Sequence, residues 1–447
     1  MLAVFLTVFC YLTVEAHMFI EFKVANFRSI RTEIALSLVA NNYDTSLPDN
    51  LIYPNLAGFS KARLLKGAAI YGPNASGKSN VLAAVRFMAE FVRNSATRLT
   101  PGDPTGTVTF CLDSNSAKGA SSFEVMAVIG GTRYTYCFSI DRERVHRESL
   151  VAYPKGSPQN WFERTYDPHT KDYNWDHSAK FFRLDKELCD KTRPNSLFVS
   201  TGAQFNNAQL TVVYNWFKNG LRFLNLEGES QFAPIHTAIL FEANKEIIPS
   251  MMSLLKSADL GITGAEVSHE DITLDSIRDS IPPSILRKIE AETKLAGLRT
   301  PLIKFKHRAE SIEDQAVDFK EESAGTRRFF SLVGPWLDIL AHGYTVLVDE
   351  LETSLHPMLV KEFLKLLFSA EHNPKGAQVI FTTHNPILLD NEIIRRDQVW
   401  FTEKDEHGAT HLYPLTDYKP RKTESLARGY LAGRYGAIPF IPEGLKL

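Results

Sequence analysis

Apolar residues follow different spacings along this chain, and each spacing predicts a kind of element. The run MFIEFKVANFRSI, which begins at Met18, alternates apolar and polar residues, so residues 18 to about 39 are expected to be strands. Three continuous apolar runs, GAAIY, YTVLVDE and AQVIFTTHN, are typical of buried parallel strands. Helical spacing appears in Val81, Val85, Met88 and Val92, and again in SLHPMLVKEFLKLLFSA. The pattern therefore predicts an α/β protein with a parallel sheet.

The middle of the chain has a different pattern. Period-two runs in VTFCLDS, FEVMAVI and RYTYCFSI predict an antiparallel lobe between about residues 101 and 155. Residues 41 to 60 and 155 to 195 are expected to be loops, the second stretch with short helices. Three further segments are expected to be helical, namely residues 207 to 224, 242 to 259 and 283 to 297. Sustained heptads and internal repeats are lacking, so a long coiled coil is not expected.

Residues 1 to 17 fit neither pattern. The run MLAVFLTVFCYLTVEAH is apolar, but it is too short to span a bilayer and no basic residues precede it. We interpret it as an extension produced by a start codon assigned too early, with Met18 as the true start, and a secretory signal is the alternative. No later run is long and apolar enough for a membrane span, so we expect no membrane contact.

Composition narrows the class of protein. Among 447 residues, 50 basic side chains nearly balance 52 acidic ones, and 44% of residues are hydrophobic. These values are typical of a globular protein and exclude collagen-like, disordered and strongly polybasic chains, so any nucleic-acid contact must use a local patch. The four cysteines, Cys10, Cys111, Cys137 and Cys189, have no paired spacing, which argues against a zinc site or a disulfide framework and favours the cytoplasm.

One run predicts a phosphate-binding loop. Gly72-Pro73-Asn74-Ala75-Ser76-Gly77-Lys78-Ser79 matches G-x-x-x-x-G-K-S/T between a predicted strand and a predicted helix. Backbone amides in such a loop bind phosphate oxygens, the Lys78 ammonium reaches the β and γ phosphates, and the Ser79 hydroxyl is a ligand of Mg²⁺. Asn80 is counted with the nucleotide-binding residues. ATP is preferred to GTP because no N-K-x-D sequence is present: residues 244 to 247 read NKEI.

Two adjacent carboxylates complement this loop. Asp349 and Glu350 end a predicted buried strand, which places Asp349 toward Mg²⁺ and Glu350 toward the water that attacks the γ phosphate. His384 ends the run QVIFTTH, where its imidazole can reach the γ phosphate or that water.

A third segment predicts a second anion site. Glu322-Ser323-Ala324-Gly325-Thr326 precedes a predicted helix, and it supplies a hydroxyl, close backbone approach and a free helix N-terminus. Taken alone, such a sequence is only a helix cap.

The order of these motifs resembles an ABC-type ATPase head of the AAA family, of the SMC, RecF and OLD kind. The resemblance covers residues 18 to 100 and 320 to 447, with the β lobe and a mixed, largely helical insert between them at 101 to 319 and the extension at 1 to 17. The runs ESAGTRR, DELETSLHP and RYGAIP resemble more closely the RloA and abortive-infection ATPases of prokaryotic phage-defence loci. The implied fold is a P-loop NTPase of the ABC-head type.

The resemblance also implies an assembly and residue roles. Two heads would form a homodimer with composite ATP sites, in which Ser323 and Gly325 touch the partner's γ phosphate. Glu350 would be the general base and His384 the γ-phosphate sensor. The signature reads SAGT and not SGGQ, which loosens the role of Thr326, and Gln204, after the strand-like SLFVST, is the candidate Q-loop residue.

The leading function is therefore an ATP hydrolase that acts as a nucleotide-dependent dimer. It would be the sensor or motor of a phage-defence or DNA-transaction system, with a separate nuclease-like effector and possibly nucleic acid as partners. The alternatives are a slow-turnover scaffold that holds an effector and a RecF-like DNA repair ATPase.

A self-contained nuclease is disfavoured, because the residues after His384 are fewer than the roughly 100 expected of a further domain. Glu403, Asp405 and Glu406 are interpreted as a polar turn between strands. A cluster of basic residues is interpreted as a solvated helix face, with phosphate or effector contact as the alternative: Arg421, Lys422, Arg428 and Arg434.

Overall fold

The protein forms two compact units in the computed structural model, which describes residues 17–224, 232–243, 248–257, 261–272, 298–309, 314–353, 355–421 and 423–439. The core unit comprises the described residues within Glu15–Leu226, Leu340–Glu352 and Val360–Leu447, and the insert unit comprises those within Glu227–Ile339 and Thr353–Leu359. The extension before residue 17, the helix expected at 283 to 297, Ser354 and Lys422 lie outside the described residues. Within the described ranges, no helix is long and apolar enough to cross a membrane.

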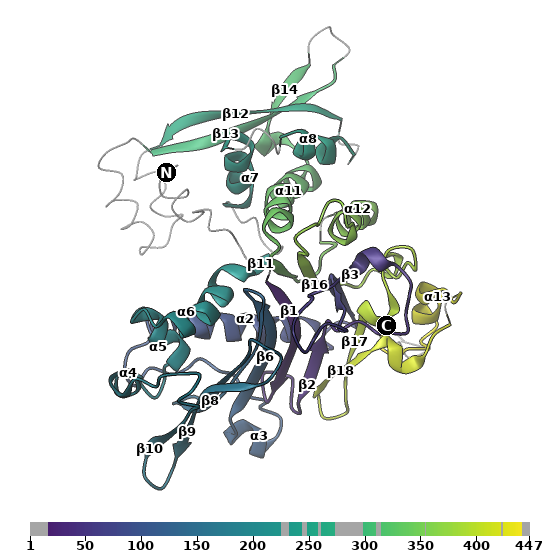
Figure 1. Ribbon diagram of the computed structural model, residues 1–447. Helices are drawn as coiled ribbons and strands as arrows, with labels where there is room; N and C mark the ends of the chain where they lie inside the picture. Colours follow the sequence, from purple (N-terminus) through teal and green to yellow (C-terminus); the bar gives the residue numbers. More distant parts are fainter. Residues whose placement is uncertain are drawn as a thin grey trace. The chain divides into compact units, whose positions relative to one another are not determined.

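A six-stranded sheet lies at the centre of the core unit (Figure 1). Its strands, in sheet order, are β11 (Leu221–Leu224), β15 (Thr345–Val348), β16 (Gln378–Thr382), β5 (Gly67–Tyr71), β17 (Val399–Lys404) and β18 (Thr410–Pro414). All neighbours are parallel except β17 and β18, which form an antiparallel pair. Every residue of β5, β15 and β16 is buried, so the continuous apolar runs do form buried parallel strands, as expected.

A seven-stranded antiparallel sheet forms the second layer of the core unit. Its strands, in sheet order, are β10 (Asp172–Asp176), β9 (Gln159–Asp167), β8 (Val145–Tyr153), β7 (Thr132–Ile140), β6 (Ser121–Ile129), β1 (Met18–Ala25) and β2 (Ile34–Ser37). Burial alternates along β1, β6 and β7, which confirms the period-two interpretation. The first strand begins at Met18, and it pairs with β6 across about a hundred residues of sequence.

Three local predictions in this region are wrong. The run VTFCLDS is not a strand: the Val108 carbonyl accepts a bond from Arg28, and the Phe110 amide donates to the Asn26 side chain. The stretch from 155 to 195 was expected to be loop, but it contains β9 and β10. The run SLFVST was interpreted as strand-like, but most of it lies in helix α5 (Phe198–Gln204).

Helices pack beside these sheets. α2 (Lys78–Asn94) buries the predicted face of Val81, Val85, Met88 and Val92. The others are α3 (Ser114–Lys118), α4 (Lys186–Lys191), α6 (Ala208–Asn215), the π-helix η3 (Trp216–Gly220), α12 (Pro357–Phe368) and α13 (Leu426–Leu431). The helix expected at 207 to 224 ends at Gly220, because the chain then enters the parallel sheet as β11.

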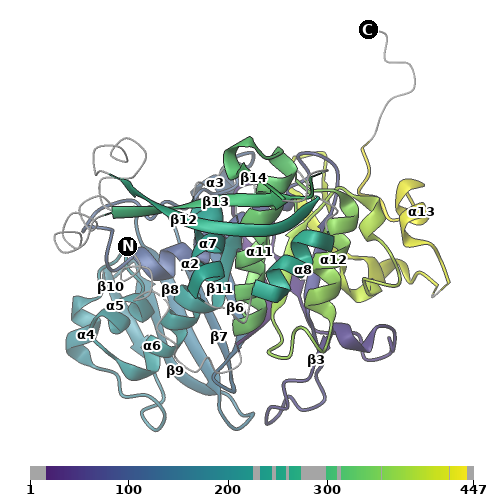
Figure 2. The ribbon, with the colours of Figure 1, turned by 90° about the horizontal axis from the view of Figure 1, so that it is seen from above.

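The insert unit combines helices with a small antiparallel sheet. Its elements are α7 (Phe232–Ala243), α8 (Ile248–Ser257), β12 (Ile262–Ile272), β13 (Leu298–His307), β14 (Gln315–Asp318), η6 (Phe319–Glu321) and α11 (Ala324–His342), whose last residues belong to the core unit. β12 and β13 form a long antiparallel pair (Figure 2). The rings of Phe305 and Phe330, with centroids 5.1 Å apart, join the sheet to α11.

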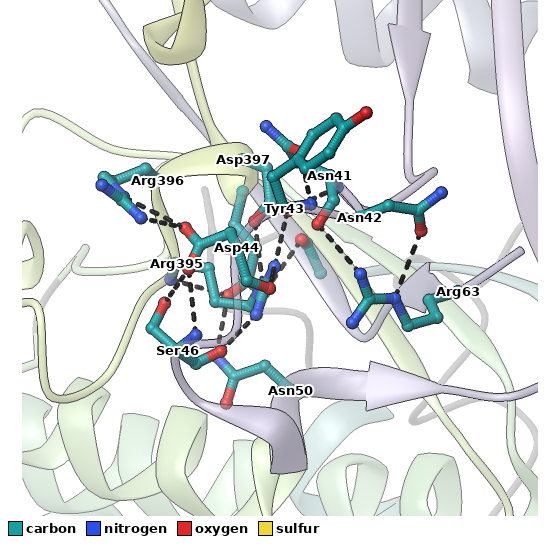
Figure 3. Close-up of polar contacts among 12 residues, drawn as sticks. Asn41, Asn42, Tyr43, Asp44, Ser46, Asn50, Arg63, Arg395, Arg396 and Asp397 are labelled. Carbon is teal, nitrogen blue, oxygen red and sulfur yellow. Dashed lines mark hydrogen bonds and ion pairs between the residues drawn. The ribbon is translucent and has the colours of Figure 1, made fainter. Parts of the chain in front are cut away.

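A polar network fastens the long connection between β2 and β5 to the parallel sheet (Figure 3). This connection contains only η2 (Pro48–Asn50) and the short strands β3 (Leu51–Ile52) and β4 (Leu64–Leu65). Arg395 pairs with Asp397 at 2.8 Å and donates to the Ser46 and Asp44 carbonyls. Burial opposes ionisation of Asp44, but hydrogen bonds from Ser46 and Arg396 lower its pKa to about 2. β17 begins at Val399, two residues after Asp397, so the network ties this connection to the start of the strand that pairs with β5.

Candidate functional site

The predicted phosphate-binding run forms a turn between β5 and α2, and we call residues 72 to 79 the glycine loop. Gly77 has a φ of 106°, a backbone conformation that favours glycine. A β-carbon at Gly77 would collide with Thr410, and one at Gly72 would collide with Thr402. The two glycines therefore let the β17–β18 hairpin pack directly against the loop.

Hydroxyl groups from distant parts of the chain hold the glycine loop in place. Ser76 Oγ lies 2.6 Å from Thr402 Oγ1, and Thr410 Oγ1 donates to the Ser76 carbonyl at 2.9 Å. Ser29, in the turn after β1, lies 2.8 Å from Thr410 Oγ1 and accepts a bond from Asn80 at 2.7 Å. Sequence reasoning missed Ser29, Thr402 and Thr410, because they lie up to 381 residues from their partners and carry no motif of their own.

Lys78 lies inside the loop. Its Nζ donates to the Gly72 and Pro73 carbonyls at 2.9 and 3.0 Å, and the side chain is buried. Burial lowers the pKa of Lys78, while the charges of Glu350, Asp349 and Glu352 oppose that shift. The three carboxylates, which we call the acidic edge, therefore lie within electrostatic reach of the ammonium. Asn74, Ala75 and Ser79 are exposed at the mouth of the loop.

The acidic edge begins where β15 ends, and β16 orders its first two residues. Thr382 Oγ1 donates to Asp349 Oδ1 at 2.5 Å and accepts a bond from the Glu350 amide at 2.7 Å. Glu350 has a φ of 49°, so its backbone is held in a conformation that non-glycine residues rarely adopt. The Asp349 carboxylate and the Ser79 hydroxyl are hard oxygen donors, which fits Mg²⁺ with water in its remaining positions.

His384 follows β16 and lies beside the acidic edge. Its Nε2 is 3.9 Å from Glu350 Oε1, and its backbone amide donates to Glu352 Oε1 at 2.7 Å. Burial lowers the pKa of His384, and the Lys78 ammonium lowers it further, although the three carboxylates oppose the shift. The imidazole is therefore mainly neutral at pH 7 and can both donate and accept a hydrogen bond. The structure thus brings Lys78, Asp349, Glu350 and His384 together.

The predicted second anion site lies in the insert unit, and we call residues 323 to 326 the serine turn. Ser323 precedes α11 and caps it, because its Oγ accepts a bond from the Thr326 amide at 3.1 Å. Ser323 and Ala324 are exposed, Gly325 is half-buried and Thr326 is buried. Gln204, the candidate Q-loop residue, is exposed at the end of α5.

The acidic residues near the C-terminus have structural partners. The predicted polar turn between strands is confirmed for Asp405 and Glu406, which lie between β17 and β18, whereas Glu403 lies within β17. Glu403 accepts a bond from the Ala437 amide, and Asp405 accepts bonds from the His407 and Ala409 amides at 3.0 and 2.8 Å. Arg434, from the basic cluster, pairs with Glu424. In the part of the chain that the structure describes, no group of three or more His, Cys, Asp or Glu residues is arranged to hold a metal ion.

Comparison with known proteins gives one family. Its model, described as "AAA domain, putative AbiEii toxin, Type IV TA system", matches residues 68–390. Curated protein sequences give no significant match. Among solved structures, the SMC head domain from Thermotoga maritima is 13% identical over 89% of this chain and 98% of that one, with a TM-score of 0.39. The recombination mediator protein RecF with ATP is 12% identical over 90% and 100%, with a TM-score of 0.34. The family match spans the glycine loop, the acidic edge and His384.

Proposed function

Since this chain belongs to the family of AAA domains described as a putative AbiEii toxin, Type IV TA system, we propose that it binds ATP with Mg²⁺ and hydrolyses the terminal phosphate. The observation that carries the proposal is a buried Lys78 held inside a pre-ordered glycine loop, within electrostatic reach of Asp349, Glu350 and His384, of which Glu350 and His384 lie 3.9 Å apart. A lysine in a loop before a helix and a carboxylate pair at the end of the neighbouring strand are what phosphoryl transfer needs.

Each side chain has a definite task in this proposal. The loop amides and the α2 N-terminus bind phosphate oxygens, and Lys78 exchanges its bonds to Gly72 and Pro73 for bonds to the β and γ phosphates. Ser79 and Asp349 would hold Mg²⁺, which would supply positive charge beside the phosphates. Glu350 accepts a proton from the attacking water, and the neutral His384 donates a hydrogen bond to the γ phosphate.

We propose that two copies of the chain complete each other's sites. The serine turn offers an exposed hydroxyl at the N-terminus of α11, which suits an anion supplied from outside the unit. The ATP-bound dimer would act as the sensor or motor of a defence system, in keeping with the toxin named in the family description, and a separate effector would act on its target.

Steady-state ATP turnover by wild-type protein and by Lys78→Ala tests the enzyme proposal. We expect Lys78→Ala to fall to background, because the loop loses the cation that faces the β and γ phosphates. The exposed Lys365, which pairs with Glu362 on α12, supplies the matched control Lys365→Ala, and that variant should keep wild-type turnover. Turnover by Lys78→Ala at the wild-type rate would refute the site.

The separate-effector proposal has its own test. Purified protein is incubated with plasmid, single-stranded DNA and tRNA, with ATP and either Mg²⁺ or Mn²⁺. We expect no cleavage, since Glu403 and Asp405 are occupied by backbone amides and the acidic edge lies within electrostatic reach of Lys78. Cleavage that survives Lys78→Ala but disappears in Glu403→Ala or Asp405→Ala would show that the effector lies in this chain.

A further inference from the structure

Glu352, the last carboxylate of the acidic edge, uses only one of its two oxygens. Oε1 accepts a hydrogen bond from the His384 amide at 2.7 Å. Oε2 is shielded from solvent and has no hydrogen-bond partner among the described residues. The sequence analysis gave Glu352 no role of its own, so its contact with the residue after β16 was not foreseen.

The surroundings of Glu352 are those of the proposed site. Burial lowers the pKa of Lys78 and of His384, and the charge of Glu352 opposes the shift in both. Burial raises the pKa of Tyr71, the last residue of β5, and Glu352 adds to that shift. The carboxylate therefore lies close to the start of the glycine loop and to the histidine at the end of β16.

In the described part of the chain, Glu352 Oε2 is a carboxylate oxygen without a hydrogen-bond donor. Shielding removes its water, and an ionised oxygen without a replacement donor is costly. None of the described donors bonds to it: two of the three N–H groups of the Lys78 ammonium donate to loop carbonyls, and the His384 amide donates to Oε1. A donor that enters with a ligand removes this cost.

We propose that Glu352 is a positioning residue with two separable tasks: Oε1 fixes the backbone of His384, and Oε2 accepts a hydrogen bond from a water molecule that enters on Mg²⁺ with ATP. The inference rests on the proposed function and extends it, because it names a third carboxylate and gives it a task distinct from binding the metal directly or activating the attacking water. Water in the coordination shell of Mg²⁺ is a strong donor, and Mg²⁺ usually keeps several such waters in proteins.

Glu352→Gln separates the two oxygens. The amide oxygen of glutamine still accepts a bond from the His384 amide, while the amide nitrogen replaces Oε2 with a donor. The change is made in the Glu350→Gln background to suppress turnover, and the affinity for a fluorescent ATP analogue is measured with Mg²⁺ and with EDTA. We expect affinity with Mg²⁺ to fall by about tenfold or more, as for loss of a bond to a charged group, and affinity in EDTA to stay within about twofold.

The controls keep the outcomes apart. Glu362→Gln, in the same background, makes the same charge change on the exposed face of α12 and should change neither affinity. An unchanged Mg²⁺ affinity, or an equal loss with and without Mg²⁺, would overturn the inference about Oε2. Failure of Glu350→Gln itself to bind ATP would overturn the proposed function instead.

A second variant tests Oε1. Glu352→Ala removes the acceptor of the His384 amide as well, so in the otherwise wild-type chain we expect its kcat to fall below that of Glu352→Gln, with the same Mg²⁺–ATP affinity. Equal kcat values for the two variants would show that Oε1 does not position His384.

Discussion

The glycine loop and the serine turn are both short glycine- and serine-containing stretches before a helix, yet the protein holds them in different ways. The glycine loop is fixed by Thr402, Thr410 and Ser29, which come from two distant hairpins. The bonds at the serine turn come from residues closer along the chain: Ser323 bonds to Thr326, and Arg327 donates to the carbonyls of residues 320 and 322. Beside it, His307 of β13 lies 2.6 Å from the Glu322 carboxylate.

Exposure differs in the same direction. Ser76, Gly77 and Lys78 are buried, whereas Ser323 and Ala324 are exposed. A loop whose geometry is set by distant parts of the fold is prepared for its ligand before the ligand arrives. An exposed, locally capped helix end depends on something outside the unit to define what it binds. The comparison therefore supports a glycine loop that is ordered within the chain before ATP binds, and a serine turn whose proposed ligand comes from a second copy.

Glu350→Gln should have the largest effect. Removal of the proposed base should lower turnover by about a thousandfold, since general bases contribute two to four orders of magnitude. ATP binding should persist, so the dimer should accumulate and light scattering should show a doubled mass only with ATP and Mg²⁺. Glu362→Gln is the control and should show wild-type turnover. A variant that stays monomeric in saturating ATP would contradict the idea that the serine turn waits for a second copy.

Ser323→Arg should have the next largest effect and separates the two regions directly. A bulky cation at the exposed helix end should block the partner's approach and lower turnover by about a hundredfold. ATP affinity of the isolated chain should be unchanged, because the glycine loop is untouched. Turnover and equilibrium binding of a fluorescent ATP analogue check both statements, with Ser253→Arg on the exposed side of α8 as control. Undiminished turnover would remove the serine turn from the site.

The sequence predicts best where a residue's neighbours along the chain decide its structure. The apolar runs at β5, β15 and β16 are short and continuous, and β-strands buried on both faces require that pattern. The stretch from 155 to 195 was misinterpreted because its strands carry aromatic and charged side chains. There Arg164 is fully buried against Glu148, so a residue that indicates exposure lies inside the lobe. Tertiary context overrides local composition in this lobe.

The same division applies to the site. Lys78, Asp349, Glu350 and His384 could be chosen from motifs, and the structure brings them together. Thr402 and Thr410 could not be chosen from motifs, because threonine is common in β-strands whatever its role. Only the pairing of β17 with β5 brings their hydroxyls to the glycine loop. Glu352 was visible in the sequence, but its bond to His384 depends on the parallel register of β15 and β16.

Thr410→Val tests whether distant residues really prepare the glycine loop. Valine keeps the shape of threonine but removes the bonds to Ser76 and Ser29, and the loop loses part of its order. We expect ATP affinity to fall by about tenfold, while kcat at saturating ATP changes little. Thr211→Val, which removes a hydroxyl bonded within α6, is the matched control. If ATP affinity is unaffected, the loop is held locally, like the serine turn, and the contrast between the two regions fails.

The pH dependence of turnover should show the smallest effect. It reports on His384 and the acidic edge and does not involve the serine turn. Because the pKa of His384 lies below its ordinary 6.5, more than about three quarters of the imidazole is neutral at pH 7, and turnover should change little between pH 7 and pH 8. Activity should decline only below pH 6.5, as the ring takes up a proton. Glu352→Gln removes a charge that raises this pKa, so the decline should move to lower pH. A decline that stays in place, measured against Glu362→Gln as control, would show that turnover does not report the titration of His384 beside the acidic edge.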